Sequence, residues 1–289
     1  MKKIVFVIAC LFLTSANSQA VKHHYDAPDQ VVWHAETKTW FVSNLGGGIS
    51  LEKDSNGWIT QTDEHGNVLH PFWIGIEQKM HAVSGMTITK DFLYACDRDG
   101  VYKINIEQRK VQEFYKIEGG EFINDVVIDE NGDLYVSDFF GNRIYKISEQ
   151  TKKAEVWLET PRLESPDGLY MEKGKLIVGS WGVLSKPNSF DTSKLGDLLS
   201  VDLKTKKITP LVKEVGNIEG ITKVGKYYFI TDWASGKILK VHPKKKKVAV
   251  FMSGLKHPTD PNYSKELAMF AFPQHGTNQV IFVKIENNK

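Results

Sequence analysis

One segment plan repeats six times along the 289-residue chain, and this repetition restricts the possible fold more than any other feature. In each copy a polar residue leads into a short apolar strand, followed by a turn, a second strand, a polar loop and a third strand. Turns such as ENGD, EKGK and KVGK connect runs rich in Val, Ile, Tyr and Phe, as half-buried strands require. Fourth strands follow in several copies, as in KKAEVWLET. The pattern predicts an all-β fold, a six-bladed β-propeller of four-stranded antiparallel blades.

The leading polar residue recurs at intervals of 40 to 55 residues, at Asp29, Ser84, Asn124, Asp167, Glu219 and Thr259. Two intervals are longer than the others. One contains the loop NLGGGISLEKDSNG after Val42–Ser43, and the other contains an insertion at residues 181–197. Both additions are expected between the second and third strands of a blade, where they leave the repeat itself unchanged.

The two ends of the expected ring each lack a partner. The last copy ends at VIFVKIENNK without a fourth strand, and the segment VKHHYD at residues 21–26 precedes the first copy. Pairing these segments would hide two exposed sheet edges at once. We therefore expect the N-terminal strand of the mature chain to close the last blade.

The first twenty residues have the order typical of a secretory signal peptide. Lys2 and Lys3 precede the apolar run IVFVIACLFL, and a stretch of small residues follows. Residues 1–20 are expected to be removed, leaving a propeller domain at 21–289 that is exported to the periplasm or secreted. A lipoprotein is the alternative, since Cys10 follows Val7–Ala9. Cleavage at residue 20 would leave Cys96 alone, so no intramolecular disulfide is expected.

The balance of basic and acidic residues argues against nucleic acid as a partner. Without residues 1–20 the chain has 35 basic and 35 acidic residues, so it has no overall field that would attract nucleic acid. The run Lys244–Lys247 is interpreted as a solvated turn between two strands. No apolar segment of the mature chain is long enough to predict a transmembrane span.

The leading polar residues are expected to meet at the propeller axis, because the innermost strands of all blades line the central channel. Asp29, Asn124, Asp167 and Glu219 would then lie together, with Ser84 and Thr259 completing the ring. Two carboxylates about 5 Å apart repel by roughly 3 kcal/mol at an effective dielectric constant near 20. Either their pKa values rise or a cation binds them. Oxygen-only ligands favour a hard ion, Ca²⁺ first and Mg²⁺ or Mn²⁺ as alternatives. In the competing interpretation each residue caps its own turn.

The sequence resembles the senescence marker protein/gluconolactonase/luciferin-regenerating enzyme family of six-bladed propellers over nearly the whole mature chain. The matching segments are PDQVVW, NDVVIDENGDLYVSD, SPDGLYMEKGKLIVGSW and NIEGITKVGKYYFITDW, in that order. The resemblance implies one axial divalent cation held by Asp29, Asp167 and Glu219, with Asn124 close by. Three positions depart from the family, which has Glu, Asn and Asp where this chain has Asp29, Asp167 and Glu219.

The resemblance also implies hydrolysis of a lactone or related ester, with Glu219 as both a ligand and the general base. Loops between the second and third strands are expected to surround the same mouth. The candidate substrate contacts are Asp138, Trp181, Asp232, Trp233 and His275, and residues 181–197 are a candidate lid. In the simpler interpretation the tryptophans only pack the blade ends and His275 is an ordinary loop histidine. A propeller that binds a partner without catalysis, with a structural axial ion, is the alternative function.

Overall fold

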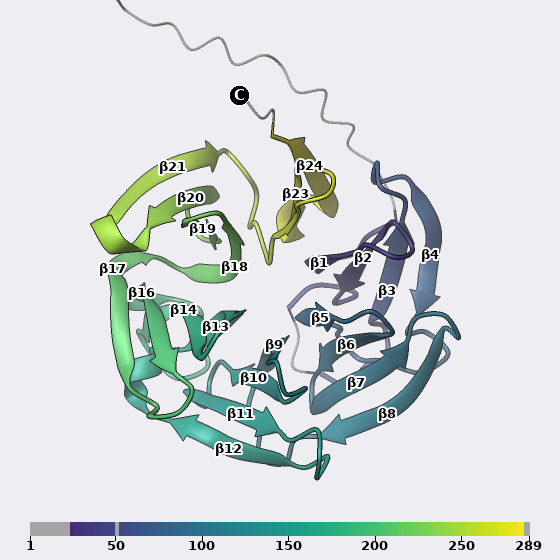
Figure 1. Ribbon diagram of the computed structural model, residues 1–289, viewed down its shortest axis with the longest axis horizontal. Coiled ribbons are helices and arrows are strands. Elements are labelled where there is room, and N and C mark those ends of the chain that lie inside the picture. The colour runs from purple at the N-terminus through teal and green to yellow at the C-terminus, as the bar shows by residue number, and fades with distance from the viewer. Residues whose placement is uncertain (1–23, 50–51, 286–289) are drawn as a thin grey trace, which may run out of the picture.

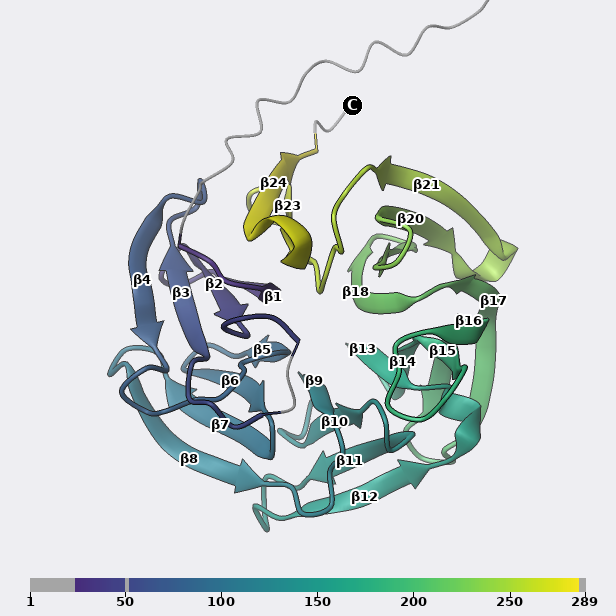
Figure 2. The same cartoon turned by 180° about the vertical axis from the view of Figure 1, so that it is seen from behind.

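The computed structural model describes residues 24–49 and 52–285, and in this range the chain forms six antiparallel sheets arranged in a ring (Figures 1 and 2). Each sheet is one blade, and consecutive blades follow one another around the axis. The six-bladed propeller expected from the repeats is confirmed. In the described ranges no helix has the length and apolar character needed to cross a membrane. The expected signal peptide at residues 1–20 lies outside these ranges, so export stays a prediction.

The first three blades have four strands each. Blade 1 contains β1 (Pro28–His34), β2 (Thr39–Asn44), β3 (Trp58–Thr62) and β4 (Val68–Ile74). Blade 2 contains β5 (Met86–Ile88), β6 (Phe92–Asp97), β7 (Gly100–Asn105) and β8 (Lys110–Lys116). Blade 3 contains β9 (Ile123–Ile128), β10 (Leu134–Asp138), β11 (Arg143–Ile147) and β12 (Ala154–Glu159).

The other three blades vary in strand number. Blade 4 contains β13 (Pro166–Glu172), β14 (Lys175–Ser180), β15 (Gly182–Leu184), β16 (Thr192–Asp202) and β17 (Ile208–Gly216). Blade 5 contains β18 (Ile218–Val224), β19 (Tyr227–Asp232), β20 (Lys237–His242) and β21 (Lys247–Ser253). Blade 6 contains β22 (Asn262–Ser264), β23 (Met269–Gln274) and β24 (Gln279–Lys284). Three 3-10 turns, η1 (Pro161–Leu163), η2 (Pro243–Lys245) and η3 (His275–Thr277), lie in connections.

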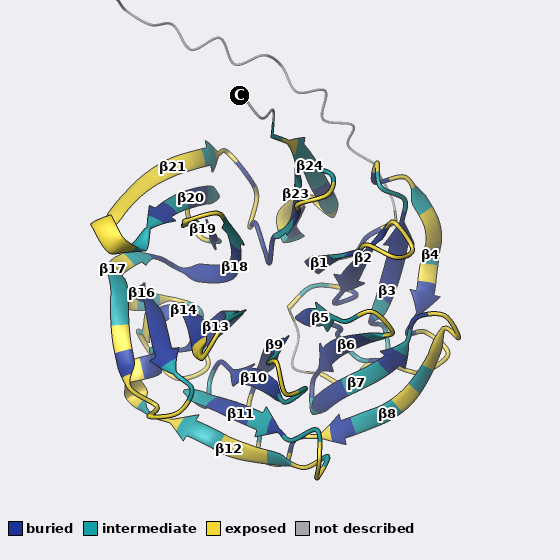
Figure 3. Ribbon diagram, in the orientation of Figure 1, coloured by how far each residue is buried: buried dark blue, intermediate teal, exposed yellow. Residues whose placement is uncertain are grey.

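Hydrophobic packing between blades holds the ring together. One apolar cluster lies between each pair of neighbouring blades, including a cluster of Tyr25, Val31 and Trp40 with Ala271 and Val280 that joins blade 1 to blade 6. The second strands are buried on both faces because each blade packs against two neighbours, whereas the outermost strand β21 is largely exposed (Figure 3). This burial of the second strands differs from the half-buried strands that the sequence pattern predicted.

The ring closes by a route that differs from the expected strand pairing. Residues 24–26 belong to no strand, and the sheet of blade 6 has three strands in the described residues; residues 21–23 lie outside them. Side-chain and backbone contacts join the ends instead. The amide oxygen of Asn278 accepts a hydrogen bond from Ala27 N at 2.8 Å, and Asp260 N donates to Asp29 O at 3.0 Å. A polar hydrogen-bond network and the apolar cluster at Tyr25 thus connect the two end blades.

The two long intervals of the repeat lie where the sequence predicted them, between the second and third strands. The loop in blade 1 connects β2 to β3. The insertion at residues 181–197 forms a short hairpin, in which β15 pairs with the first part of β16 and extends blade 4. The indole Nε1 of Trp181 donates to Phe190 O at 2.8 Å and ties the base of this hairpin to its tip.

Candidate functional site

The first residues of the inner strands meet at one end of the axis, around a small cavity of about 30 Å³. Five of the six leading polar residues line it: Asp29, Ser84, Asn124, Asp167 and Glu219. The sixth, Thr259, is used differently, because its hydroxyl donates to Pro28 O at 3.1 Å. The cavity has room for an ion or a water molecule. Residues up to 190 positions apart in sequence are therefore neighbours at the axis, as the repeat predicted.

A shift in strand register places these residues at the axis. The pairing of the inner with the second strand is interrupted between Pro28 and Val31, and blades 3, 4 and 5 have interruptions at their inner strands too. Such bulges free backbone groups that need other partners. Side-chain hydroxyls supply them, since Ser43, Ser137 and Thr231 accept the N–H groups of Gln30, Asp125 and Gly220 at 2.7–2.9 Å.

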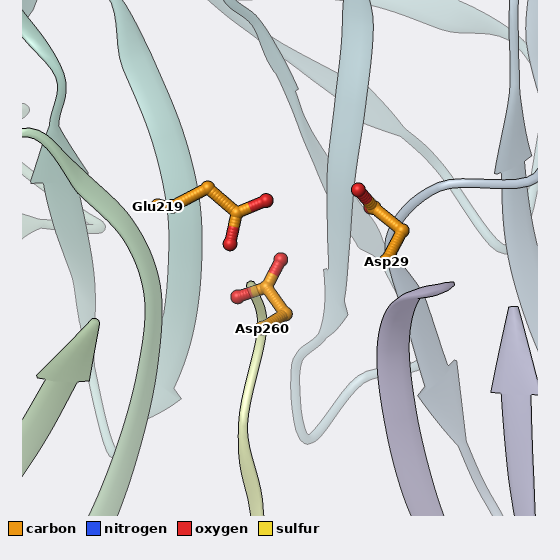
Figure 4. Close-up of side chains that lie close together, drawn as sticks. All are labelled: Asp29, Glu219 and Asp260. Carbon is orange, nitrogen blue, oxygen red and sulfur yellow. The ribbon is translucent and has the colours of Figure 1, made fainter. Parts of the chain in front are cut away.

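Three buried carboxylates come together at the axis: Asp29, Glu219 and Asp260 each place an oxygen within 4.8 Å of the others. Their side chains point toward one another from blades 1, 5 and 6 (Figure 4). Asp260 was not among the ligands expected from the sequence, because it stands one residue after the leading position of its repeat. Asn124 and Asp167 line the same cavity, but the Asn124 amide donates a hydrogen bond to Asp167 Oδ1.

Burial dominates the electrostatics of the axis. It raises the pKa values of Asp167, Glu219 and Asp260 well above their ordinary range, and neighbouring carboxylates raise them further. Burial likewise raises the pKa of Asp125 to about 8, although its oxygens accept the N–H groups of Leu169 and Val126. Ionising all of these groups together in a dry cavity is unfavourable without a positive charge.

The donor set fits a hard divalent cation. The ligand atoms available in the three-carboxylate cluster are all oxygens, which Ca²⁺, Mg²⁺ and Mn²⁺ prefer. Two of the oxygens, Asp29 Oδ2 and Glu219 Oε2, are buried and have no hydrogen-bond partner within residues 24–49 and 52–285. Buried acceptors without partners are rare in folded proteins, and an ion or a water molecule bound here would satisfy both oxygens. Asp29, Glu219 and Asp260 are therefore the residues best placed to hold a cation.

The expected substrate contacts divide into two groups. Trp181, Trp233 and His275 line the axial cavity, as the sequence predicted for loops that follow the second strand. Asp138 and Asp232 do not line it. The carboxylate of Asp138 accepts from Phe122 N at 2.9 Å and pairs with Arg143 Nε at 3.2 Å, and Asp232 accepts from Asn217 N at 3.2 Å. Both carboxylates accept hydrogen bonds from backbone N–H groups and do not line the axial cavity, so the geometry does not support a role for them in substrate binding.

Asp138 and Asp232 belong to a second recurrent polar position, at the last residue of the second strand in every blade. In each blade this side chain is hydrogen-bonded to the backbone of the segment just before the inner strand. The six residues are Asn44, Asp97, Asp138, Ser180, Asp232 and Gln274. The position is a structural brace that fixes where each inner strand begins, and so fixes the residues that reach the axis.

A larger pocket of about 420 Å³ adjoins the axial cavity and shares Ile49, Trp233 and His275 with it. The Trp233 ring stacks on His257 at 3.8 Å between centroids, which makes one wall flat and aromatic. Phe122, Trp181 and Phe190, which belong to one apolar cluster with Phe139, line the axial cavity and not this larger pocket. A pocket of this volume accommodates a small organic molecule, and it meets the axial cavity at Ile49, Trp233 and His275.

Comparison with known proteins supports the fold and goes no further. No protein-family model and no curated protein matches the sequence. Among solved structures, the chain is similar to a gluconolactonase from Xanthomonas campestris, with a TM-score of 0.67, 10% identity, and 91% of this chain and 87% of that chain covered. It is also similar to a virginiamycin B lyase from Staphylococcus aureus, with a TM-score of 0.60, 12% identity, and 93% and 98% covered.

A chain of a nidogen/laminin complex is similar as well, with a TM-score of 0.63, 13% identity, and 89% of this chain and 88% of that chain covered. The three proteins have unrelated roles according to their names, a lactonase, a lyase and a member of a protein complex. One fold serves many functions, so the function must be argued from the site itself.

Proposed function

We propose that the chain is a divalent-cation-dependent hydrolase of a lactone or related ester, acting at the propeller axis. The observation that carries the proposal is the convergence of Asp29, Glu219 and Asp260, whose buried oxygens lie within 4.8 Å of one another. Three mutually repelling acids, two of which have a buried oxygen without a partner among the described residues, are unfavourable unless a cation binds them. Ca²⁺ is the first ion to test, with Mg²⁺ and Mn²⁺ as alternatives.

Asp29, Glu219 and Asp260 would hold the ion, and Asp167 and Asn124 line the axial cavity together with Asp29 and Glu219. When bound, a hard divalent cation supplies Lewis acidity that polarises an ester carbonyl and makes a water molecule more acidic. The hydrogen bond from Asn124 keeps the Asp167 carboxylate oriented toward the axis. The hydrogen bond from His275 orients the Asp29 carboxylate in the same way.

Glu219 is the proposed general base. It accepts a proton from the attacking water on Oε2, the buried oxygen that has no partner. Burial raises the pKa of Glu219, which makes its carboxylate a stronger proton acceptor than an exposed glutamate. The water oxygen bonds to the carbonyl carbon and the ester C–O bond breaks. The proton held by Glu219 then passes to the leaving alcohol oxygen, so a lactone yields a hydroxy acid.

The test is hydrolysis of a panel of aldonolactones and aryl esters by the mature protein, with and without a chelator. We expect turnover that the chelator abolishes, that added Ca²⁺ restores, and that Glu219→Gln removes. Glu130→Gln is the matched control, since Glu130 is an exposed acid in a turn of blade 3. Turnover that is insensitive to chelator would contradict the proposal.

A non-catalytic binding platform with a structural axial ion is the second candidate. The size of the axial cavity favours it, because about 30 Å³ holds an ion but not a whole lactone. Thermal stability separates the two candidates. An ion at a hundredfold its dissociation constant stabilises the fold by about 2.7 kcal/mol. If no ester in the panel is hydrolysed while the chelator still lowers the melting temperature, the ion is structural and the second candidate is correct.

A further inference from the structure

Arg98 is a buried cation in the axial cavity that the proposed hydrolysis does not use. It follows β6 directly, is 7% exposed and lines the cavity together with Asp29. Its backbone N–H donates to Asp97 Oδ1 at 2.8 Å, which fixes where the side chain starts. Its guanidinium lies 5.1 Å from the centre of the Phe122 ring. This cation–π contact positions the guanidinium and leaves its N–H donors free for hydrogen bonds.

The guanidinium has donors that no protein group accepts. Its Nε and Nη2 are buried and have no hydrogen-bond partner among the residues that the structure describes. The acids whose charges act on it are Asp97, Asp29 and Asp54. Within residues 24–49 and 52–285, none of these forms an ion pair with it. Asp97 accepts three backbone N–H groups, Asp29 is bonded to His275, and Asp54 accepts from Asn56.

Buried guanidinium groups are normally paired, because removing their hydration without replacing it is costly. Nε and an Nη group form the planar fork that matches a carboxylate in a bidentate arrangement. An apolar wall at Phe122 and Phe190 flanks the same space, so the complementary ligand has one anionic end and an apolar body.

We propose that Arg98 binds a carboxylate of the substrate, so that the preferred ester or lactone is an anionic one. This inference rests on the proposed hydrolase function and specifies its substrate class. The ligand is a singly charged carboxylate and not a phosphate, because a phosphate brings up to two negative charges next to the axial acids. The carboxylate lies at Arg98, the scissile carbonyl faces Glu219, and the remaining part extends into the 420 Å³ pocket.

The test compares two aryl esters of similar size, mono-4-nitrophenyl glutarate and neutral 4-nitrophenyl butyrate, with Ca²⁺ present. Wild type is expected to have the higher kcat/KM for the glutarate. Arg98→Met keeps the stem but removes the fork, and should lower kcat/KM for the glutarate about 10- to 100-fold while changing the butyrate less than about threefold. Arg98→Lys keeps the charge and should recover only part of the loss. Arg109→Met is the control, since Arg109 is exposed in a turn of the same blade.

The outcomes that overturn the inference differ from those that overturn the hydrolase. Wild type that prefers the butyrate, or Arg98→Met that loses both activities equally, contradicts a carboxylate site. If wild type hydrolyses neither of these esters nor any member of the lactone and ester panel, the hydrolase proposal fails, and a binding measurement tests the carboxylate site instead. Glutarate monoanilide is then titrated against the fluorescence of Trp181 and Trp233 in the wild type and Arg98→Lys. Saturable binding weakened by the substitution supports the carboxylate site, and its absence overturns it.

Discussion

His275 Nε2 lies 2.9 Å from Asp29 Oδ1, although the two residues are 246 positions apart in the chain. The contact links η3 of blade 6 to β1 of blade 1, beside the point where the ring closes. A carboxylate only accepts hydrogen bonds, so the imidazole N–H donates. Since Oδ1 is occupied in this way, Asp29 is held with its other oxygen, Oδ2, buried at the axis without a partner. The same histidine therefore closes the ring and orients a candidate ligand.

Replacing His275 with alanine is expected to weaken cation binding. Without the imidazole, Asp29 is free to rotate, and losing a residue that orients a metal ligand typically costs 10- to 100-fold in affinity. Ca²⁺ titration of the metal-free protein by calorimetry measures the change. His65→Ala is the control, because the side chain of His65 is 71% exposed on a turn of blade 1. Equal affinity of His275→Ala and wild type would show that the contact only closes the ring.

The metal-free protein is expected to lose stability as the pH rises from about 4 to 8. Burial raises the folded-state pKa values of Asp167, Glu219 and Asp260 well above the unfolded value near 4, and that of Asp125 to about 8. The folded state therefore binds more protons than the unfolded state over this range. Each such group therefore lowers the free energy of unfolding as the pH rises from its unfolded pKa toward its folded pKa.

Urea unfolding with a chelator at pH 5 and pH 8 measures this loss, and the same curves with saturating Ca²⁺ measure its recovery. The stabilisation by Ca²⁺ should be larger at pH 8, since protons compete with the ion at pH 5. Asp260→Asn should reduce both the pH dependence and the gain from Ca²⁺. A gain that is the same at both pH values would contradict the acidic axis as the cation site.

Asp138 provides a test of the structural brace. Replacing it with alanine leaves the buried N–H of Phe122 without an acceptor and Arg143 without one of its acids. We expect a loss of about 2–4 kcal/mol in the free energy of unfolding, measured with urea. Asp138→Asn keeps an acceptor oxygen and should lose less, and the exposed Asp191→Ala is the control. A substrate contact would behave differently, since its removal would raise KM with little change in stability.

The two recurrent polar positions show what sequence periodicity can and cannot predict. The leading polar residue of each repeat was predicted to reach the axis, and Asp29, Ser84, Asn124, Asp167 and Glu219 line the axial cavity. The fold was predictable for the same reason, because the repeat period reflects one blade. Asp138 was assigned to the substrate because the loops between the second and third strands were expected to surround the mouth. Periodicity places a residue near the axis but does not show whether its side chain faces the cavity or its own backbone.

Asp260 was missed for a related reason. In the sixth repeat Thr259 occupies the leading position, and its hydroxyl binds Pro28 O. The acid of that blade comes one residue later, where blade 3 has Asp125 and blade 5 has Gly220. Acids at this second position are visible in the sequence as the pairs ND and TD. Whether an acid at this second position joins the leading polar residues at the axis depends on how its blade packs against the neighbouring blade. The sequence of a single repeat does not show that packing.

Gly220 is the residue whose small size brings Asp260 to the cluster. A Cβ at this position would lie 2.3 Å from Asp260 Oδ1 and 2.4 Å from Asp260 Cα. Because the second contact is with backbone, Gly220→Ala must push blade 6 away from blade 5 and separate Asp260 from Glu219. We expect weaker Ca²⁺ binding by calorimetry, and a decrease of about 1–3 kcal/mol in the free energy of unfolding measured with urea.

Gly225→Ala is the control that separates the effect on stability from the effect on Ca²⁺ binding. At Gly225 φ is +59°, but no atom of the described residues lies within 4 Å of the added Cβ. The substitution should lower stability and leave Ca²⁺ affinity unchanged. Wild-type affinity in Gly220→Ala would show that Asp260 is not a ligand.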